Sequence, residues 1–225
     1  MKKLIFLLLF VACTVAKAQT FSCPELKKDI AAWNKLEKSS NYQEWAQDIY
    51  DNKLYKQGST GGIEYTYVIT SNANISMQSL RELTLDYLSV YFKITSQMRA
   101  GISSRNAPDQ ILFTGSINKL ATFYSLFEEN YVDAKINFDI RFRENRIRFN
   151  VRIDDYHVRQ TSDGKILQDK VVHVRNTFPL YRKSDHKDSY SRAFINANSK
   201  CMNYADYFVK FLNKNANKKI AEENW

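Results

Sequence analysis

An alternation of apolar and polar residues, running from Ile136 to Ile153, constrains the fold of this chain more than any other feature. Alternation with a period of two is typical of a β-strand that buries one face. The apolar positions on either side of Glu144-Asn145 share a face only if a loop of two or four residues joins the two strands. We therefore expect a hairpin. Its expected cross-strand pairs are Phe142 with Ile147, Ile140 with Phe149, and Phe138 with Val151.

The opposite face of this hairpin carries basic side chains. Five arginines fall on it: Arg141, Arg143, Arg146, Arg148 and Arg152. The expected register sets Arg141 directly opposite Arg148, and like charges so placed repel each other unless Asp139, solvent or a bound anion offsets them. The face is therefore either the ordinary solvated side of an antiparallel sheet or a surface for an anionic partner.

The first residues have the pattern of a bacterial export signal. Two lysines precede an apolar run from Leu4 to Val15, and Ala16-Lys17-Ala18 is a small-x-small site, which predicts cleavage between Ala18 and Gln19. The run is shorter than the roughly 20 residues of a membrane span. The alternative is a degenerate lipobox ending at Cys13, which would leave that cysteine lipidated, although Phe10 fits such a motif poorly.

Removal of residues 1–18 leaves a mildly basic chain with room for one domain and an extension. Three lysines and no acid are lost, so the formal charge falls from +9 to +6, below what is typical of nucleic-acid-binding proteins. No second apolar stretch is long enough to cross a membrane, so we expect the mature protein to be soluble.

Two cysteines remain in the mature chain, Cys23 and Cys201. An exported protein meets an oxidising compartment, so the two could form a disulfide. Cys201 also falls on the apolar stripe of an expected helix, where a free buried thiol is common. Both interpretations are left open.

The pattern outside the hairpin divides the mature chain into three parts. Residues 19–57 form a helical N-terminal extension, with a capping box at Ser22 and Glu25 and a flexible joint over Gln57–Gly62. Residues 58–213 form the main domain, and residues 214–225 a polar, frayed tail.

Within the main domain we expect an antiparallel sheet of about five strands with two helices on one face, in the order β-α-β-β-β-β-α. We leave two segments without regular structure: the polar loop Arg99–Asp109, and Leu120–Tyr131, which has room for a short strand or helical turn. A bulge at Asp154-Asp155 would re-aim Tyr156 and Val158. The expected strands outside the hairpin are Ile63–Thr70, Gln110–Ile117 and Ile166–Val174, the last after a turn at Asp163-Gly164. One expected helix centres on Leu80–Tyr91, and the other runs from near Ser189 to Leu212.

The combined pattern resembles a domain of unknown function with a TATA-binding-protein-like (TBP-like) fold, found in exported bacterial proteins. The export signal, the strand Ile63–Thr70, the helix Ser79–Lys93, the strand Asp109–Gly115 and the strand pair Ile136–Tyr156 carry this resemblance. It covers residues 63–158, and the last helix by topology only. The resemblance implies the fold and no reaction.

No catalytic constellation stands out in the sequence, and we expect no enzyme, cofactor or metal site. There is no Gly-x-Ser-x-Gly elbow, phosphate-binding glycine loop or His-Glu-x-x-His pair. The turn at Asp163-Gly164 could bring His173 near His157 and Asp154, which leaves an enzyme with an unrecognised site as an alternative.

The sequence predicts a non-enzymatic binding or assembly module of the periplasm or cell envelope. Its expected partner is an anionic envelope component or another envelope protein. Nucleic acid is an unexpected partner, because the chain is exported and the basic face lacks aromatic and wedge residues. A structural adaptor acting through the helices of residues 19–57 is the remaining alternative.

Overall fold

The computed structural model describes residues 20–72, 74–125, 128–162, 165–177 and 186–223. The expected export signal, with Cys13 and the junction between Ala18 and Gln19, lies outside these ranges. The expected turn at Asp163-Gly164 also lies outside them, although the strands on either side pair from Ser162 to Lys165.

The described residues form five α-helices, one short 3-10 helix and seven strands, which confirms the α+β class. The sheet has more strands than the five expected. The helices are α1 (Pro24–Lys35), α2 (Tyr42–Asp51), α3 (Met77–Phe92), α4 (Ser96–Arg105) and α5 (Lys187–Glu223), with η1 (Val174–Asn176). The strands are β1 (Phe21–Ser22), β2 (Ile63–Ser71), β3 (Gln110–Ser125), β4 (Glu128–Arg143), β5 (Arg146–Ile153), β6 (Asp155–Ser162) and β7 (Lys165–His173).

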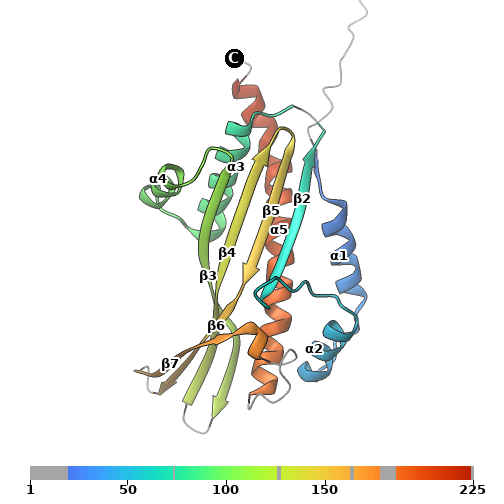
Figure 1. Cartoon of the computed structure of the whole chain (residues 1–225), viewed down its shortest axis with the longest axis vertical. Helices are drawn as coiled ribbons and strands as arrows, with labels where there is room; N and C mark the ends of the chain where they lie inside the picture. Colours follow the sequence, from blue (N-terminus) through green and yellow to red (C-terminus); the bar gives the residue numbers. More distant parts are fainter. Residues whose placement is uncertain (1–19, 73, 126–127, 163–164, 178–185, 224–225) are drawn as a thin grey trace, which may run out of the picture.

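The sheet is antiparallel throughout and is organised around the long strand β4. One edge of β4 pairs with β3, and the other edge pairs first with β6 and then with β5. The strand order is β1-β2-β5-β4-β6-β7, with β3 beside β4. Figure 1 looks onto one face of this sheet, with α5 passing behind the strands.

The expected hairpin is confirmed in its register. A loop of two residues joins β4 to β5, Phe142 faces Ile147, and Arg141 faces Arg148. Asn145 takes the left-handed φ of 56° in this loop, a conformation that asparagine tolerates better than most residues. All eight apolar residues of the predicted hairpin, from Ile136 to Ile153, are buried.

The expected bulge after β5 is also confirmed, and it accounts for one additional strand. On β4, the residues that pair with Arg152 and Tyr156 are Asn137 and Ala134, which are three positions apart. Arg152 and Tyr156 are four positions apart, so one extra residue lies between β5 and β6. Ile153 and Tyr156 are therefore both buried. The short strand β1, which pairs with the end of β2, is the other additional strand.

The helices α3 and α5 cover the rear face of the sheet, as expected for the two main helices. The 37 residues of α5 make a helix roughly 55 Å long. The prediction of a frayed tail after residue 213 was wrong, because α5 continues to Glu223. Extending an existing helix through lysine, alanine and glutamate needs no new nucleus and requires no apolar stripe.

The N-terminal helices α1 and α2 pack against α5. Leu26, Ala46 and Ile49 are buried in the same hydrophobic cluster as the sheet. The capping box was wrong: Ser22 lies in β1, and Cys23 is the N-cap of α1 without a side-chain hydrogen bond. The expected joint is a hydrogen-bonded turn instead, in which the N–H of Gly58 donates to Gly62 O (2.9 Å) and the N–H of Gly61 to Gly58 O (2.9 Å).

Cys23 and Cys201 are both buried and unbridged, so the structure lacks the disulfide left open by the sequence. Burial raises the pKa of each thiol. The charges of Glu25, Asp29 and Lys56 also influence the pKa of Cys23. For Cys201, inside the sheet–helix core, burial is the cause of the raised pKa.

Two segments expected to be irregular are regular. The loop after α3 contains α4, which buries no residue and is attached to α3 by Arg99, in contact with Glu82 and Asp86 (both 2.5 Å). The segment Leu120–Tyr131 belongs mostly to β3 and β4, which pair around an irregularity between Ile117 and Ala121. Within the described residues, no helix combines the length and apolar character needed to cross a membrane.

Candidate functional site

The candidate site is the open face of the sheet, the side turned away from α3 and α5. Figure 1 shows this face toward the reader, with no helix in front of β2, β5, β4 and β3. Alternate residues of these four strands project from it, because their neighbours are buried against the helices. The open face therefore consists of aligned rows of mostly polar side chains across four strands, with Val68 and Leu112 as exposed apolar members.

Four of the five predicted arginines form a block at the hairpin end of this face. We call it the arginine quartet: Arg141 and Arg143 on β4, and Arg146 and Arg148 on β5. Arg143 faces Arg146 and Arg141 faces Arg148 in the paired register. All four arginines are exposed to solvent. Two like-charged pairs thus stand beside each other, an arrangement that destabilises a sheet unless a counter-charge is near.

One carboxylate partly offsets this block. Asp139 on β4 accepts hydrogen bonds from Arg141 (3.1 Å) and from the amide of Gln110 (2.7 Å). Burial alone would raise the pKa of Asp139, but the hydrogen bonds from Arg141 and Gln110 and the charge of Arg148 outweigh it, so the pKa is lowered. Among the described residues, no carboxylate forms an ion pair with the other three arginines of the quartet.

The sequence predicted one basic surface of five arginines, but the fifth, Arg152, has a carboxylate partner of its own. Its Nε lies 2.7 Å from Asp154 Oδ2, a carboxylate that also accepts a hydrogen bond from Thr60 (2.6 Å). Asp154 occupies the bulge between β5 and β6. Arg152 is therefore neutralised locally, whereas three members of the quartet are not.

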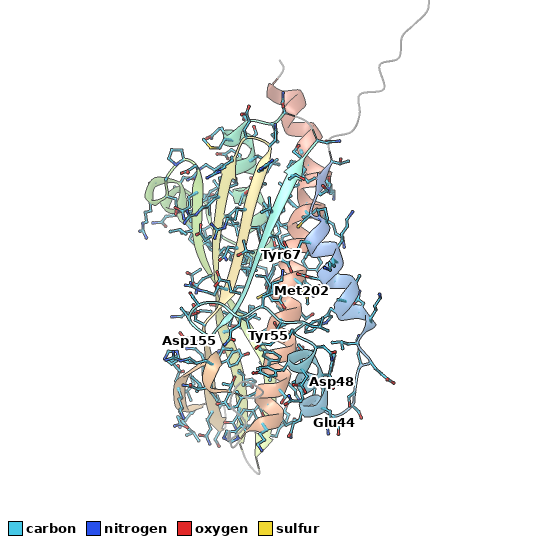
Figure 2. The ribbon with its side chains drawn as sticks, turned by 45° about the vertical axis from the view of Figure 1, so that its right-hand side comes forward. Glu44, Asp48, Tyr55, Tyr67, Asp155 and Met202 are labelled. Carbon is cyan, nitrogen blue, oxygen red and sulfur yellow. The ribbon has the colours of Figure 1, made fainter. Side chains whose placement is uncertain are left out.

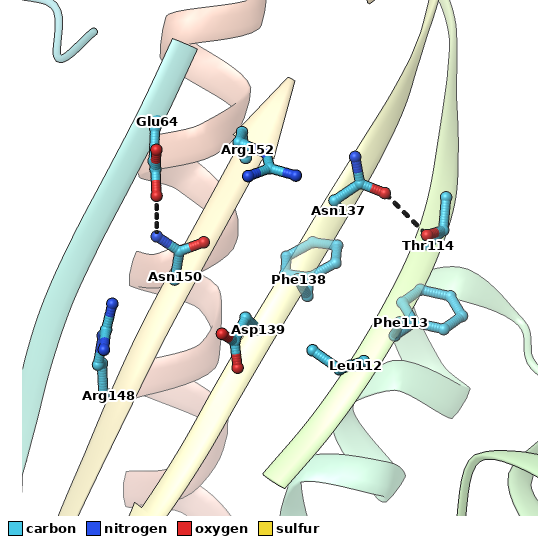
Figure 3. Close-up of a pocket in the computed structure, with 10 residues that line it drawn as sticks. All are labelled: Glu64, Leu112, Phe113, Thr114, Asn137, Phe138, Asp139, Arg148, Asn150 and Arg152. Atoms are coloured by element: carbon cyan, nitrogen blue, oxygen red, sulfur yellow. Dashed lines mark hydrogen bonds between the residues drawn. The ribbon is translucent and has the colours of Figure 1, made fainter. Parts of the chain in front are cut away.

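A hollow of about 390 Å³ opens beside the quartet and is shown in Figure 3. Arg148 belongs to both features, so the hollow and the quartet are continuous. The lining residues are Glu64, Leu112, Phe113, Thr114, Asn137, Phe138, Asp139, Arg148, Asn150 and Arg152.

Hydrogen bonds fix the polar side chains of this hollow. Asn150 donates through Nδ2 to Glu64 Oε1 and to Thr66 Oγ1, both at 2.7 Å. Thr114 donates to Asn137 Oδ1 at 2.8 Å. Figure 3 shows both bonds that lie between lining residues, reaching across neighbouring strands. The hollow is therefore lined by oriented amides rather than by mobile side chains.

The alternation of the hairpin places Asn137 and Asn150 on its polar side, together with the arginines, but it does not identify the hollow. Glu64 comes from β2 and Thr114 from β3, which flank the hairpin on opposite sides. β3 directly precedes β4 in the sequence, but β2 is separated from the hairpin by α3, α4 and β3. Alternation reveals the face of each strand, but it does not reveal which distant strand pairs with which.

The alternative enzyme site is assembled only in part. His173 lies opposite Asp155, and the two side chains are in contact, with His157 two residues further along β6. Asp154 instead accepts a hydrogen bond from Thr60 and is not part of this group. In the described residues, no group of three histidine, cysteine, aspartate or glutamate side chains could hold a metal ion.

The end of the open face away from the hairpin carries charges that are paired. We call it the paired end: the contacts Asp133–Arg159 and Asp155–His173 on β4, β6 and β7. The Asp133 side chain is only 8% exposed, and it also accepts a hydrogen bond from the backbone N–H of Lys119 (2.6 Å). This bond anchors the irregularity of β3.

No known protein family matches the sequence, and no curated protein matches it. Among solved structures, the chain is similar to a TBP-like protein from Parabacteroides distasonis, with 11% identity and a TM-score of 0.47 over 72% of this chain and 97% of the other. This TM-score is too low to establish a shared fold. The TBP-like fold therefore stays a prediction, and the α+β architecture follows from the strands and helices of the chain itself.

Proposed function

We propose that this protein is an exported, non-enzymatic binding module, which holds an anionic component of the bacterial envelope on the arginine quartet. The observation that carries the proposal is the pair of like-charged rows, Arg143 with Arg146 and Arg141 with Arg148, of which only Arg141 forms an ion pair with a described carboxylate, that of Asp139. Arginine presents a fixed fork of donors that matches carboxylate and phosphate groups. A bound anion would both satisfy these donors and remove the repulsion between facing guanidinium groups.

The position of the quartet supports binding rather than a structural role. Its side chains are exposed on a face that no described helix covers, and they stand on strands whose apolar side is buried. The paired strands fix the backbone that carries each arginine before any partner binds, so binding has to order only the side chains. This limits the conformational entropy that binding must overcome.

The experiment compares retention of the mature chain, residues 19–225, on dextran sulfate at low and increasing salt. We expect replacement of the four quartet arginines by glutamine to abolish retention and to flatten its salt dependence, because fewer counterions are released. The single-charge comparison pairs Arg146→Gln, in the quartet, with a control, Arg192→Gln, which removes one positive charge from α5, where Asp188 is the partner of the arginine (3.0 Å). We expect this control to elute close to wild type.

Unchanged elution of the quartet variant would refute the proposed function. So would equal losses for Arg146→Gln and Arg192→Gln, because binding would then depend on net charge alone. Thermal unfolding of each variant checks that the fold is intact.

The export route is a separate part of the proposal with its own test. Cleavage between Ala18 and Gln19 predicts that the N-terminal residue of the mature protein is Gln19 or its cyclised form. Recovery of a lipidated Cys13 in the membrane fraction would instead support the lipobox alternative, and a protein that retains Met1 would refute export.

A further inference from the structure

We infer that the hollow beside the arginine quartet receives a sugar ring of an acidic polysaccharide, whose carboxylate lies on Arg148 and Arg141. This inference rests on the proposed function, because it assigns a chemical class to the anion that the quartet binds. It adds a second group of residues, Asn137, Asn150 and Leu112, whose role is to recognise the uncharged part of that ligand.

The hydrogen-bonding groups of the hollow that remain free are of both kinds. Asn137 accepts through Oδ1 from Thr114, and no described residue accepts from its Nδ2. Asn150 uses both Nδ2 hydrogens on Glu64 and Thr66, which leaves its Oδ1 as an acceptor. Figure 3 shows this oxygen turned away from Glu64, toward β4. A hydroxyl group can donate and accept, whereas a carboxylate or phosphate dianion only accepts.

The carboxylates at the rim of the hollow are already engaged. Glu64 accepts from Asn150, and Asp139 accepts from Arg141 and Gln110. The donors that remain belong to Asn137, Arg148 and the terminal nitrogens of Arg152, while the two carboxylates keep lone pairs for further donors. These donors suit a ligand that is rich in oxygen, while Asn150 Oδ1 suits one that also carries hydroxyl groups.

The apolar wall completes the match to a sugar. Leu112 is 52% exposed although it stands on a strand, and it lines the hollow beside Thr114. One face of a pyranose ring presents C–H groups and buries them against such a side chain. The volume of about 390 Å³ lies within the usual range of small-molecule sites, roughly 300–1,000 Å³.

The arrangement along the strands favours a chain over a single sugar. Asn137 and Arg143 are six residues apart on β4, about 20 Å along an extended strand. The quartet and the hollow therefore form one continuous track, in which acidic groups meet arginines at one end and ring hydroxyls meet amides at the other. A polymer of uronate sugars carries both groups on every ring.

The experiment compares binding of the mature chain to polygalacturonate and to polyacrylate at equal carboxylate concentration. The two polymers carry the same acidic group, but only the first has sugar rings. We expect wild type to bind polygalacturonate about tenfold more tightly, the effect of one or two additional net hydrogen bonds. Asn137→Ala should reduce this preference to about threefold or less, since it removes one of the donors.

The matched control is Asn118→Ala, an exposed asparagine on β3 outside the hollow, which should keep the full preference. Glutamine variants of the quartet should lose binding to both polymers. Equal binding of wild type to both polymers would overturn the sugar inference and leave the proposed function standing. Loss of wild-type binding to both would overturn the two together.

Two further outcomes decide against the hollow. An unchanged preference in Asn137→Ala, with its melting temperature intact, would place recognition elsewhere on the chain. Tighter binding to vesicles of anionic phospholipid than to polygalacturonate would show that the quartet serves a membrane surface, and the sugar inference would then be wrong.

Discussion

The two ends of the open face carry the same kinds of charged side chain but use them differently. At the hairpin end, Arg141 is paired with Asp139, and no described carboxylate forms an ion pair with the other three arginines. At the paired end, Arg159 and His173 each have a carboxylate of their own, and that of Asp133 is almost fully buried. A cation with a buried partner contributes to holding strands together, whereas an exposed cation without one contributes little to stability and stays free to bind.

The cause of this difference lies in which side chains the register places together. At the paired end, Asp155 faces His173, and Asp133 lies diagonally across from Arg159. The backbone N–H of Lys119, a residue with a positive φ of 55°, also donates to Asp133. At the hairpin end, the register places arginine opposite arginine in two neighbouring pairs.

The largest expected effect compares the two aspartates. Asp133→Asn should lower the free energy of unfolding by about 2 kcal/mol, because it weakens hydrogen bonds made to a buried charged group. Asp139→Asn should lower it by about 0.5 kcal/mol or less, because its partner Arg141 is exposed to solvent. Urea unfolding of both variants measures the difference. Equal losses would show that the two ends do not differ in this way.

A smaller effect of opposite sign is expected for the quartet. Arg146→Gln removes one half of a like-charged pair and should raise the free energy of unfolding by about 0.5 kcal/mol at low salt. The gain should vanish at 1 M salt, where charges are screened over about 3 Å. Arg159→Gln, at the paired end, should be destabilising under the same conditions. A destabilised Arg146→Gln would mean that the quartet has structural partners.

The smallest effect is a pH dependence at Asp139. The pKa of this carboxyl is lower in the folded state than in the unfolded chain, so its ionised form stabilises the fold above about pH 4. That contribution, at most about 0.5 kcal/mol, is lost as the pH falls through the folded pKa. Urea midpoints of wild type and Asp139→Asn, measured from pH 6 to pH 2, should therefore converge at the acid end. A constant gap would contradict the lowered pKa.

The sequence was sufficient for the parts of the fold that a simple period encodes. The hairpin register, the bulge after β5 and the helix α3 all follow from the spacing of apolar residues that are now seen to be buried. The face occupied by the arginines followed from the same alternation. Their division into a quartet and a neutralised Arg152 did not, because it depends on how the bulge positions Asp154.

The elements that sequence analysis missed are those held by polar contacts. The helix α4 buries no side chain, so it has no apolar stripe to detect. Arg81 of α3, which is 5% exposed, donates to the carbonyl groups of Ser103, Ala107 and Gln110 and holds the segment after α4 against β3. In β3, the extra residues near Lys119 interrupt the alternation, and the bond that compensates comes from Asp133 on another strand.

The bulge at Asp154 changes which residues of the chain, even-numbered or odd-numbered, face solvent. Before it, even-numbered residues of β5 face solvent; after it, odd-numbered residues of β6 do, so Arg152 and His157 share one side while Ile153 and Tyr156 share the other. If the strand ran through position 154 without a bulge, β6 would turn over, directing His157 and Arg159 into the core and Tyr156 into water. Deleting Asp154 should instead leave these residues on their present sides, because it restores the regular alternation. The bulge therefore lets the chain insert Asp154, the partner of Arg152, without changing which side chains of β6 are buried.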